Sequence, residues 1–173
     1  LNNVKLGEIK KINIIGLIGH DKKIILQNLQ NIKLNNIFLI NDKNINNTLN
    51  SLAFVESYEI FKRYPSTLDI KIKKTELLAK TSHDGKLSII GSNGKFLKNE
   101  TLNIQLPFVF GNPEAKDFLK LMQIINESKI SYDEIENFYF FPSKRWDLEL
   151  TNNVIIKLPK KNIKEKLNIV FEF

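Results

Sequence analysis

Few side chains in this sequence are of a type and spacing that could do chemistry. The two histidines, His20 and His83, stand beside turn residues and far from each other in the chain. Neither has a partner at metal-ligand spacing, such as a second histidine four residues along one helix. The absence of cysteine also excludes thiolate metal sites and disulfides. We therefore expect surface histidines and no metal or other cofactor.

Asp147 and Glu149 are the closest approach to a catalytic pair of carboxylates. Catalysis needs polar groups that converge on a reacting atom. Here the two acids alternate with the apolar residues Trp146, Leu148 and Leu150, which is the pattern of a strand with one buried and one outward face. The alternation predicts two carboxylates that point outward rather than into an active site.

Two further motifs fall short of an active site. The run Gly91–Lys95 is shorter than a phosphate loop, which needs GxxxxGK and then Ser or Thr between a strand and a helix. Its residues favour a hairpin turn instead. Ser82, Ser88 and Ser143 do not stand in the context of a nucleophile elbow. The residues therefore predict a protein that is not an enzyme.

The composition is that of a globular protein. With 173 residues, of which 42% are hydrophobic, the chain can bury the core of one medium domain or of two small ones. No apolar run approaches the roughly 20 residues of a membrane-spanning helix. The longest runs, Ile12–Ile18 and Ile37–Ile40, have the length of strands. Because the sequence starts at Leu1 rather than at Met, we expect it to be part of a longer protein.

The net charge of +7 leaves several partners open. Nucleic acid and an anionic membrane surface are common partners of a basic protein. A nucleic-acid site would gather cations on one face together with aromatic side chains, whereas the lysines here are spread along the whole chain. We expect a solvated basic surface and no binding of nucleic acid.

The first half of the chain predicts the order strand, helix, helix, strand, strand. Strands alternate apolar with polar residues, and helices repeat apolar residues at three and four positions behind a capping aspartate. Strands are expected over Glu8–Gly16, where Gly16 ends the strand, and over Val55–Tyr64 and Thr67–Lys74, on either side of the Pro65-Ser66 turn. Helices are expected over Lys22–Ile32, behind Asp21, and behind Asp42, where Ile45, Leu49 and Leu52 share one face. An extended piece is expected over Asn36–Ile40.

The second half predicts short strands with turn residues between them, one long helix and a last helix. Pro113 suits the first turn of the long helix. The expected strands cover Leu77–Thr81, Leu87–Ile90, Lys95–Leu97, Leu106–Phe110, which Gly111 ends, Glu134–Phe141, Trp146–Leu150 and Val154–Leu158. The long helix is expected from Pro113 to about Ser128, with Phe118, Leu121, Met122 and Ile125 buried. The last helix is expected behind Asn162, with Ile163, Leu167 and Val170 on its inner face.

Three stretches of these residues resemble the extracytoplasmic region of the FtsQ/DivIB family of bacterial cell-division proteins. Asn50–Lys80 is similar to a family segment that carries a basic pair, an aromatic residue and a proline, although Leu78 replaces the family's usual proline. Asp84–Phe96 is similar to a family hairpin. Lys144–Leu158 resembles the hairpin that starts with basic residues and tryptophan, with Asn153 where glycine is common. The three occur in the family's order over nearly the whole chain.

The resemblance implies an α+β fold in two domains. Residues 8–75 would form a POTRA (polypeptide-transport-associated) domain of order β-α-α-β-β. Residues 76–173 would form the family's second α+β domain, with a mainly antiparallel sheet whose last strand would follow Phe173. Also implied is a non-enzymatic scaffold in the periplasm that is held in the inner membrane by one N-terminal span. Such a scaffold binds FtsB and FtsL and helps to regulate septal peptidoglycan synthesis.

Two basic segments are candidates for binding partners. Lys62, Arg63 and Tyr64 precede Pro65 and could form a basic and aromatic rim. The same residues allow a structural interpretation, in which Pro65 sets the turn and Tyr64 packs on the core.

Lys144 and Arg145 are the stronger candidates. Solvent should reach them at the start of a strand, while Trp146 anchors the core. Arg and Trp are frequent in interface hot spots, and the resemblance places this pair near the face that receives FtsB by strand addition.

A second function stays open at this stage. POTRA domains also occur in receptors and chaperone modules of outer-membrane protein insertion or secretion. Those proteins usually carry tandem POTRA repeats or a following membrane barrel, whereas the second half of this chain does not repeat the first.

Overall fold

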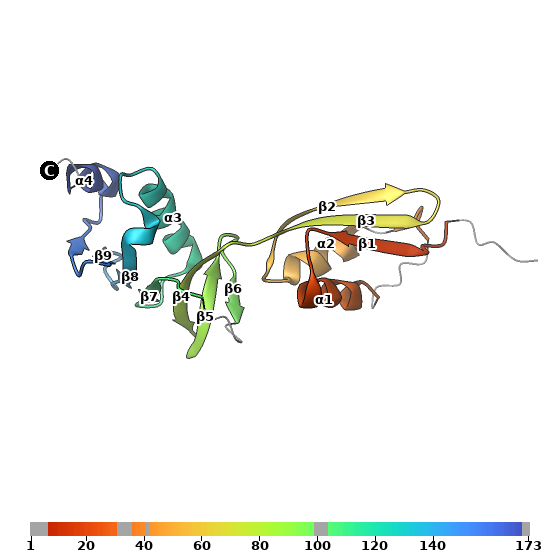
Figure 1. The fold of residues 1–173 in the computed structure, drawn as a ribbon, viewed down its shortest axis with the longest axis horizontal. Helices are drawn as coiled ribbons and strands as arrows, with labels where there is room; N and C mark the ends of the chain where they lie inside the picture. The colour runs from red at the N-terminus through yellow and green to blue at the C-terminus, as the bar shows by residue number, and fades with distance from the viewer. Residues whose placement is uncertain (1–6, 31–35, 41, 99–103, 171–173) are drawn as a thin grey trace, which may run out of the picture. The chain divides into compact units, whose positions relative to one another are not determined.

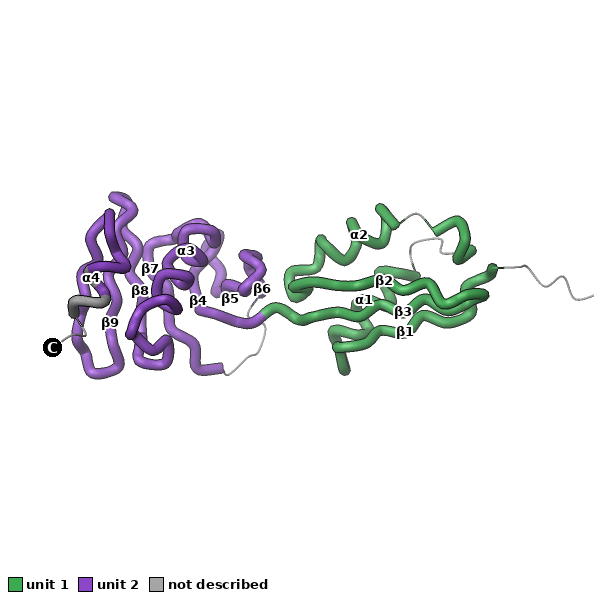
Figure 2. The backbone as a smooth tube through the Cα atoms, turned by 90° about the horizontal axis from the view of Figure 1, so that it is seen from above, with its two compact units in different colours: residues 1–75 green, residues 76–173 purple. Residues whose placement is uncertain are grey.

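The computed structural model describes residues 7–30, 36–40, 42–98 and 104–170. The chain divides into two compact units, unit 1 over residues 1–75 and unit 2 over residues 76–173 (Figure 2). Each unit carries its own sheet and its own hydrophobic core. No described helix is both long and apolar enough to cross a membrane.

Unit 1 consists of a three-stranded sheet and two helices (Figure 1). In the sheet order β1-β3-β2, the central strand pairs in parallel with β1 and antiparallel with β2. The elements are β1 (Lys11–Ile15), α1 (Gly19–Gln30), α2 (Asp42–Ser51), β2 (Val55–Arg63) and β3 (Thr67–Lys74). The order of strand, two helices and two strands is the one that the sequence predicts.

The core of unit 1 follows from the two periodicities in the sequence. A strand turns alternate side chains to one face of its sheet, and a helix repeats its buried side every three to four residues. Leu68, Ile70 and Ile72 of β3 are therefore buried together with one stripe from each helix. The helix residues in this cluster are Ile25 and Leu29 of α1 and Ile45 and Leu49 of α2.

Three local expectations for unit 1 are wrong. The first strand begins at Lys11 rather than at Glu8, since Glu8 forms only an isolated bridge with Asn36. Helix α1 begins at Gly19, which places Asp21 in its first turn rather than at its cap. The segment after Asn36 is a turn and not an extended piece, because the Leu39 amide donates to the Asn36 carbonyl at 3.0 Å. Ile32 lies outside the described residues.

In the part of the chain that the structure describes, unit 2 is built on a seven-stranded sheet of order β10-β9-β8-β7-β4-β5-β6. Figure 1 labels strands β4 to β9 of this sheet. The pairs β4–β7 and β7–β8 are parallel and the other pairs are antiparallel. Its elements are β4 (Leu77–His83), β5 (Lys86–Gly91), β6 (Phe96–Lys98), β7 (Phe108–Phe110), α3 (Ala115–Asn126), a 3₁₀ turn (Tyr132–Glu134), β8 (Ile135–Phe140), β9 (Trp146–Leu150), β10 (Ile155–Lys157) and α4 (Ile163–Val170). The predicted α+β fold with a mainly antiparallel sheet is confirmed.

Helix α3 supplies most of the helical part of this core. The predicted stripe of Phe118, Leu121, Met122 and Ile125 is buried. Helix α4 adds Leu167, which is fully buried, while the side chain of Val170 lies outside the described residues. The sheet residues of the cluster include Ala79, Ile90, Val109, Phe138, Trp146 and Leu148.

The sequence predicts Pro113 in the first turn of α3, but in the structure Pro113 lies before the helix. Glu114 has extended backbone angles and is the N-cap residue, so Pro113 precedes the helix by two residues. The Glu114 carbonyl accepts the first helical bond, from the Asp117 amide at 2.9 Å. The helix also ends at Asn126, two residues before the expected end at Ser128.

Gly16 and Gly111 end their strands in the same way. Both have a φ near +90°, which L side chains rarely adopt. A Cβ atom at Gly16 would overlap the carbonyl oxygen of Ile72, and one at Gly111 would overlap that of Phe140. Glycine therefore allows each strand end to lie directly against the backbone of another strand.

Candidate interaction surfaces

Strand β10 forms one edge of the sheet in unit 2. Within the part of the chain that the structure describes, it pairs only with β9. The amide of Leu158 donates to the Trp146 carbonyl at 3.0 Å, and the amide of Leu150 donates to the Val154 carbonyl at 2.9 Å. Because backbone groups alternate in direction along an antiparallel pair, Ile155 and Lys157 turn their N–H and C=O groups to the open side.

The hairpin that carries β10 is anchored by aromatic packing. Trp146, at the start of β9, is 4% exposed. Its ring centroid lies 4.8 Å from that of Phe140 and 6.2 Å from that of Phe118. Contacts between aromatic rings stabilise a core beyond the area that they bury. Strand β10 therefore pairs with a strand whose first residue is packed in the core of unit 2.

Arg145 is engaged in a contact within its own hairpin. Its Nε and Nη2 donate to the two carboxylate oxygens of Asp147 at 3.1 and 3.3 Å. Its guanidinium carbon also lies 4.5 Å from the centroid of the Phe141 ring. The Arg145 side chain is 42% exposed and that of Asp147 only 7%. Arg145 thus neutralises a carboxylate that the fold has buried.

Two expectations from the sequence change at this point. Asp147 does lie on the face opposite Trp146, but it is buried and not solvated. Arg145 is only partly available to a partner, because it already holds Asp147. Lys144 is exposed with a φ of +61°, at a turn in which its amide donates to the Phe141 carbonyl at 2.8 Å. Of the two predicted cations, Lys144 is therefore the better placed to meet a partner.

Next to this pair, Glu149 belongs to a polar cluster on the outer face of the sheet. It accepts hydrogen bonds from the Tyr139 hydroxyl at 2.6 Å and from the Asn137 amide at 2.9 Å. The Tyr139 hydroxyl first, and the Asn137 amide second, lower the pKa of the Glu149 carboxyl. The same hydrogen bond raises the pKa of Tyr139. These contacts tie Glu149 of β9 to strand β8.

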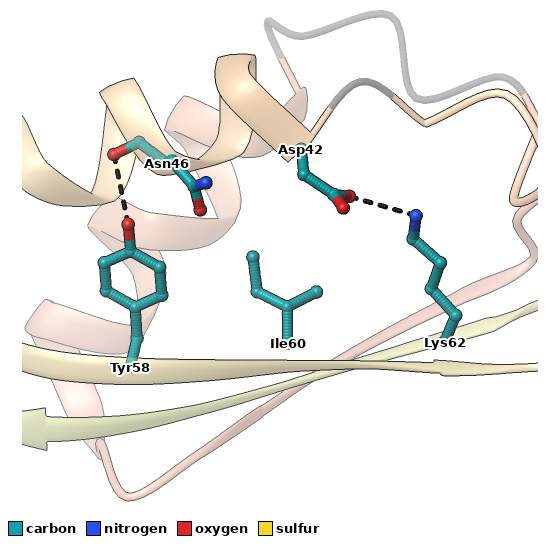
Figure 3. Close-up of a pocket in the computed structure, with 5 residues that line it drawn as sticks. All are labelled: Asp42, Asn46, Tyr58, Ile60 and Lys62. Carbon is teal, nitrogen blue, oxygen red and sulfur yellow. Dashed lines mark hydrogen bonds and ion pairs between the residues drawn. The ribbon is translucent and has the colours of Figure 1, made fainter.

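Strand β2 is an edge of the sheet in unit 1, and a hollow of about 510 Å³ lies beside it (Figure 3). Ile60 forms its apolar floor. At one end the Tyr58 hydroxyl donates to the Asn46 carbonyl at 3.5 Å. At the other end the Lys62 ammonium lies 3.0 Å from an Asp42 carboxylate oxygen. Lys62 therefore faces helix α2 and pairs with its first residue.

Arg63 lies on the opposite face of the same sheet, since neighbouring residues of a strand point to opposite sides. Its Nε lies 2.5 Å from the Asp69 carboxylate. Asp69 is 3% exposed and also accepts a bond from the Asn13 side chain at 2.7 Å. One buried carboxylate on β3 thus ties β1 and β2 to the central strand. Lys62 and Arg63 do not form one continuous basic rim.

Tyr64 does not pack on the core, which corrects the structural interpretation given above. It is 61% exposed at the turn that contains Pro65. Its ring stacks on Phe38, with centroids 5.0 Å apart and an interplanar angle of 19°. The sequence does not predict this stacking, because the segment that carries Phe38 was expected to be extended and is a turn instead.

Two of the remaining candidates for chemistry, His83 and Ser88, have local contacts. His83 stacks on Phe96 with ring centroids 3.8 Å apart. The hydroxyl of Ser88 donates to the Lys86 carbonyl at 3.3 Å. Among the residues described here, no three His, Asp or Glu side chains gather in a way that could hold a metal ion. In the described residues, the candidate sites for binding a partner are therefore strand edges and exposed side chains.

The order of the elements indicates the class of protein. A β-α-α-β-β unit followed by a sheet-rich unit is the organisation of a POTRA domain joined to a second α+β domain. The family model "POTRA domain, FtsQ-type" matches residues 8–74, and the model "Cell division protein FtsQ/DivIB, C-terminal" matches residues 79–172. The chain belongs to the FtsQ/DivIB family of cell division proteins.

Curated relatives named cell division protein FtsQ have similar sequences. The Rickettsia bellii protein is 27% identical over 164 residues, which cover 94% of this chain and 61% of that protein. The Rhizobium radiobacter protein is 23% identical over 121 residues, which cover 69% of this chain and 58% of that protein. The chain thus spans less than two thirds of the length of these relatives.

A solved structure is also similar. It is the major extracytoplasmic domain, in its trans isomer, of the cell division protein DivIB from Geobacillus stearothermophilus. The match covers 55% of this chain and 87% of that one, with a TM-score of 0.40 and 12% identity.

Proposed function

We propose that this protein is a non-enzymatic scaffold of the bacterial division machinery. It binds FtsB and FtsL, and through them it helps to regulate septal peptidoglycan synthesis. The region described here lies in the periplasm, and a single N-terminal span holds the protein in the inner membrane. Membership of the FtsQ/DivIB family supports a role in cell division, and the partners, the location and the mode of action are our proposal.

The open edge of β10 is the observation that carries this proposal. Ile155 and Lys157 direct backbone donors and acceptors away from β9. An added strand satisfies such groups, and the main-chain bonds supply affinity while side chains supply specificity. We infer that the sheet is extended on this side, by the family's last strand and then by a segment of FtsB. Lys144, at the turn before β9, supplies a cation for acidic residues of that partner.

A role as a receptor in outer-membrane protein insertion or secretion is less well supported. Residues 8–74 match the FtsQ-type POTRA model, and the rest of the chain matches the FtsQ/DivIB C-terminal model. Both matched models are of the FtsQ type, which favours the role in cell division over the role in outer-membrane insertion or secretion.

The edge can be tested by changing its backbone. In the full-length protein, Lys157→Pro removes an outward N–H without removing a bond to β9. We expect capture of the cognate FtsB and FtsL periplasmic segments to fall at least about ten-fold, because the family's last strand needs main-chain bonds to β10 before it can receive FtsB. Lys157→Ala is the matched control and should bind as the parent does. Equal binding by both variants would show that the sheet is not extended at β10.

The basic contact needs a separate variant. Reversal of Arg145 would disturb the buried Asp147 and so confuse binding with stability. Lys144→Glu avoids this problem, since Lys144 is exposed. We expect a several-fold slower association with FtsB that depends on salt, as for a charge at the rim of an interface. An unchanged association rate would remove Lys144 from the contact surface.

A further inference from the structure

Unit 1 presents three large apolar side chains to solvent at one place. Phe38 is 54% exposed, Leu39 80% and Tyr64 61%. The stacking of Phe38 on Tyr64 joins the turn after Asn36 to the turn between β2 and β3. Exposed apolar residues are common singly, but a contiguous group of them usually marks an interaction site. We name Phe38, Leu39 and Tyr64 the apolar tip.

The apolar tip is a built feature of the fold. Ile37 is fully buried and anchors the turn, and its amide donates to the Gly7 carbonyl at 2.7 Å. The Phe38 amide donates to the Asn36 side-chain oxygen at 2.9 Å. A Cβ at Gly7 would lie 2.5 Å from the Phe38 ring, so glycine gives the ring its place. The fold thus holds Phe38 and Leu39 outward instead of allowing them to fold back.

Cations lie beside the turn that carries Tyr64. The amides of Lys10 and Lys11 donate to the Ser66 carbonyl, at 2.9 and 3.3 Å, which places both residues beside the β2–β3 turn. Both lysines are exposed, and the Arg63 side chain is 73% exposed although it contacts Asp69.

The carboxylates near the apolar tip offset this charge only in part. Asp69 is buried beneath Arg63, and Asp42 is paired with Lys62. Glu8 is the exposed acid beside Lys10. Among the described residues near the tip, the charges that solvent reaches are therefore mainly positive.

We propose that the apolar tip docks on the surface of a lipid bilayer. Aromatic and aliphatic side chains that enter the interface, with Lys and Arg toward anionic headgroups, are the composition of interfacial membrane contacts. Gly7 and Glu8, the first residues that the structure describes, lie at this tip, because Gly7 is next to the Phe38 ring and Glu8 bridges to Asn36. The inference rests on the membrane location in the proposed function, which would bring the tip close to the bilayer.

The experiment uses the 173-residue chain with an N-terminal histidine tag on vesicles that contain nickel-chelating lipid. The chain has no cysteine, so Leu39→Cys carries a single environment-sensitive fluorophore at the tip. Ile18→Cys is the matched control, because Ile18 is also apolar, is 89% exposed and lies in unit 1 outside the tip. The tag replaces any native span, so the result does not depend on FtsB, FtsL or the β10 edge.

On vesicles with phosphatidylglycerol, we expect the emission at position 39 to rise about two-fold or more and to shift to the blue. Lipids with a quencher on the acyl chain should reduce it, whereas the probe at position 18 should respond little. Lys10→Glu with Lys11→Glu should lower the response, and added salt should do the same.

Two results would overturn the proposal. One is an equal response of the probes at positions 39 and 18. The other is a blue shift at position 39 that acyl-chain quenchers leave unchanged, which would indicate contact with a second copy of the chain instead of lipid. As a check without a label, sedimentation of the untagged Phe38→Ser, Leu39→Ser variant with the same vesicles should be several-fold lower than that of the parent.

Discussion

At the scale of single residues, Gly111 shows how the absence of a Cβ atom allows a strand to end against another strand. Gly111→Ala places a Cβ against the Phe140 carbonyl and keeps a φ of +91°, which is unfavourable for alanine. We expect the free energy of unfolding of unit 2 to fall by about 2 kcal/mol or more, since both strain and overlap contribute. Chemical denaturation followed by the fluorescence of Trp146, the single tryptophan of the chain, measures this change.

Gly85→Ala is the control for that experiment. Gly85 has a φ of +72°, but a Cβ there meets nothing within 4 Å. Its substitution therefore adds backbone strain alone, and we expect a loss of only about 1 kcal/mol. Equal losses for the two variants would show that the close approach to Phe140 does not matter.

Tyr139 offers a test of electrostatics at the same scale. Its hydroxyl is the main cause of the lowered pKa of Glu149, and the Asn137 amide is the second cause. Tyr139→Phe should therefore raise the pKa of Glu149 toward its usual value, as a carbon-13 NMR titration of the side-chain carboxyl would show. Asn137→Ala should have the smaller effect of the two.

The sign of the effect on stability follows from the lowered pKa. A carboxyl whose folded-state pKa is lowered stabilises the fold above the unfolded-state pKa, and this contribution is lost as pH falls through the folded-state value. Tyr139→Phe should make the stability of unit 2 less dependent on pH in the acidic range. Its stability should differ least from that of the parent at the lowest pH. A parent-like acid profile would contradict the assignment.

At the scale of elements, the β8–β9 hairpin depends on the pairing of Arg145 with Asp147. Removal of one partner from a buried pair leaves an unpaired charge, which is destabilising. Because Arg145 is 42% exposed, solvent screens part of this cost. We expect Arg145→Met to lower the free energy of unfolding by about 1–2 kcal/mol, and Asp147→Asn added to it should restore part of the loss.

Lys144→Gln is the comparison for the Arg145 variant in the same denaturation experiment. This residue is exposed, so the substitution should change the free energy of unfolding by no more than about 0.5 kcal/mol. A double-mutant cycle over Arg145 and Asp147 would isolate the pair. A coupling energy of zero would mean that Asp147 is buried for another reason.

The sequence predicts elements well where periodicity is strong. Strand β3 matches its predicted range, and the buried stripe of α3 was predicted residue by residue, because a period of two or of 3.6 leaves little choice. The ends of helices are predicted less well. Pro113 was expected in the first turn of α3 but precedes the helix, since proline is compatible with several positions near a helix start. The turn after Asn36 was missed because short apolar runs carry no period.

The candidate site was less predictable than the fold. Alternation along a strand gives the face on which a side chain lies but not what covers that face. The alternation predicts that Asp147 points outward to solvent, yet its carboxylate is buried and paired with Arg145. The open edge of β10 was likewise invisible, because strand order in a sheet is a tertiary property.

At the scale of the whole molecule, the two units have cores that share no residue. The cluster of unit 1 includes Leu49 and the cluster of unit 2 includes Phe118, and both side chains are fully buried. Separate cores allow separate cooperative unfolding, since each unit buries its own apolar surface. Residues 8–75 and 76–173, the domains predicted from the sequence, should then behave as two folding units.

Core truncations in each unit test this independence. Leu49→Ala should lower the stability of unit 1 by about 2–4 kcal/mol, and Phe118→Ala should lower that of unit 2 by about 3–5 kcal/mol. In hydrogen exchange, each variant should lose amide protection throughout the sheet of its own unit, while the sheet of the other unit keeps the protection of the parent. A loss of protection that spreads over β2 and β3 in the Phe118 variant would mean that the chain unfolds as one cooperative body. Unit 1 could then not hold the apolar tip at a membrane independently of partner binding at β10.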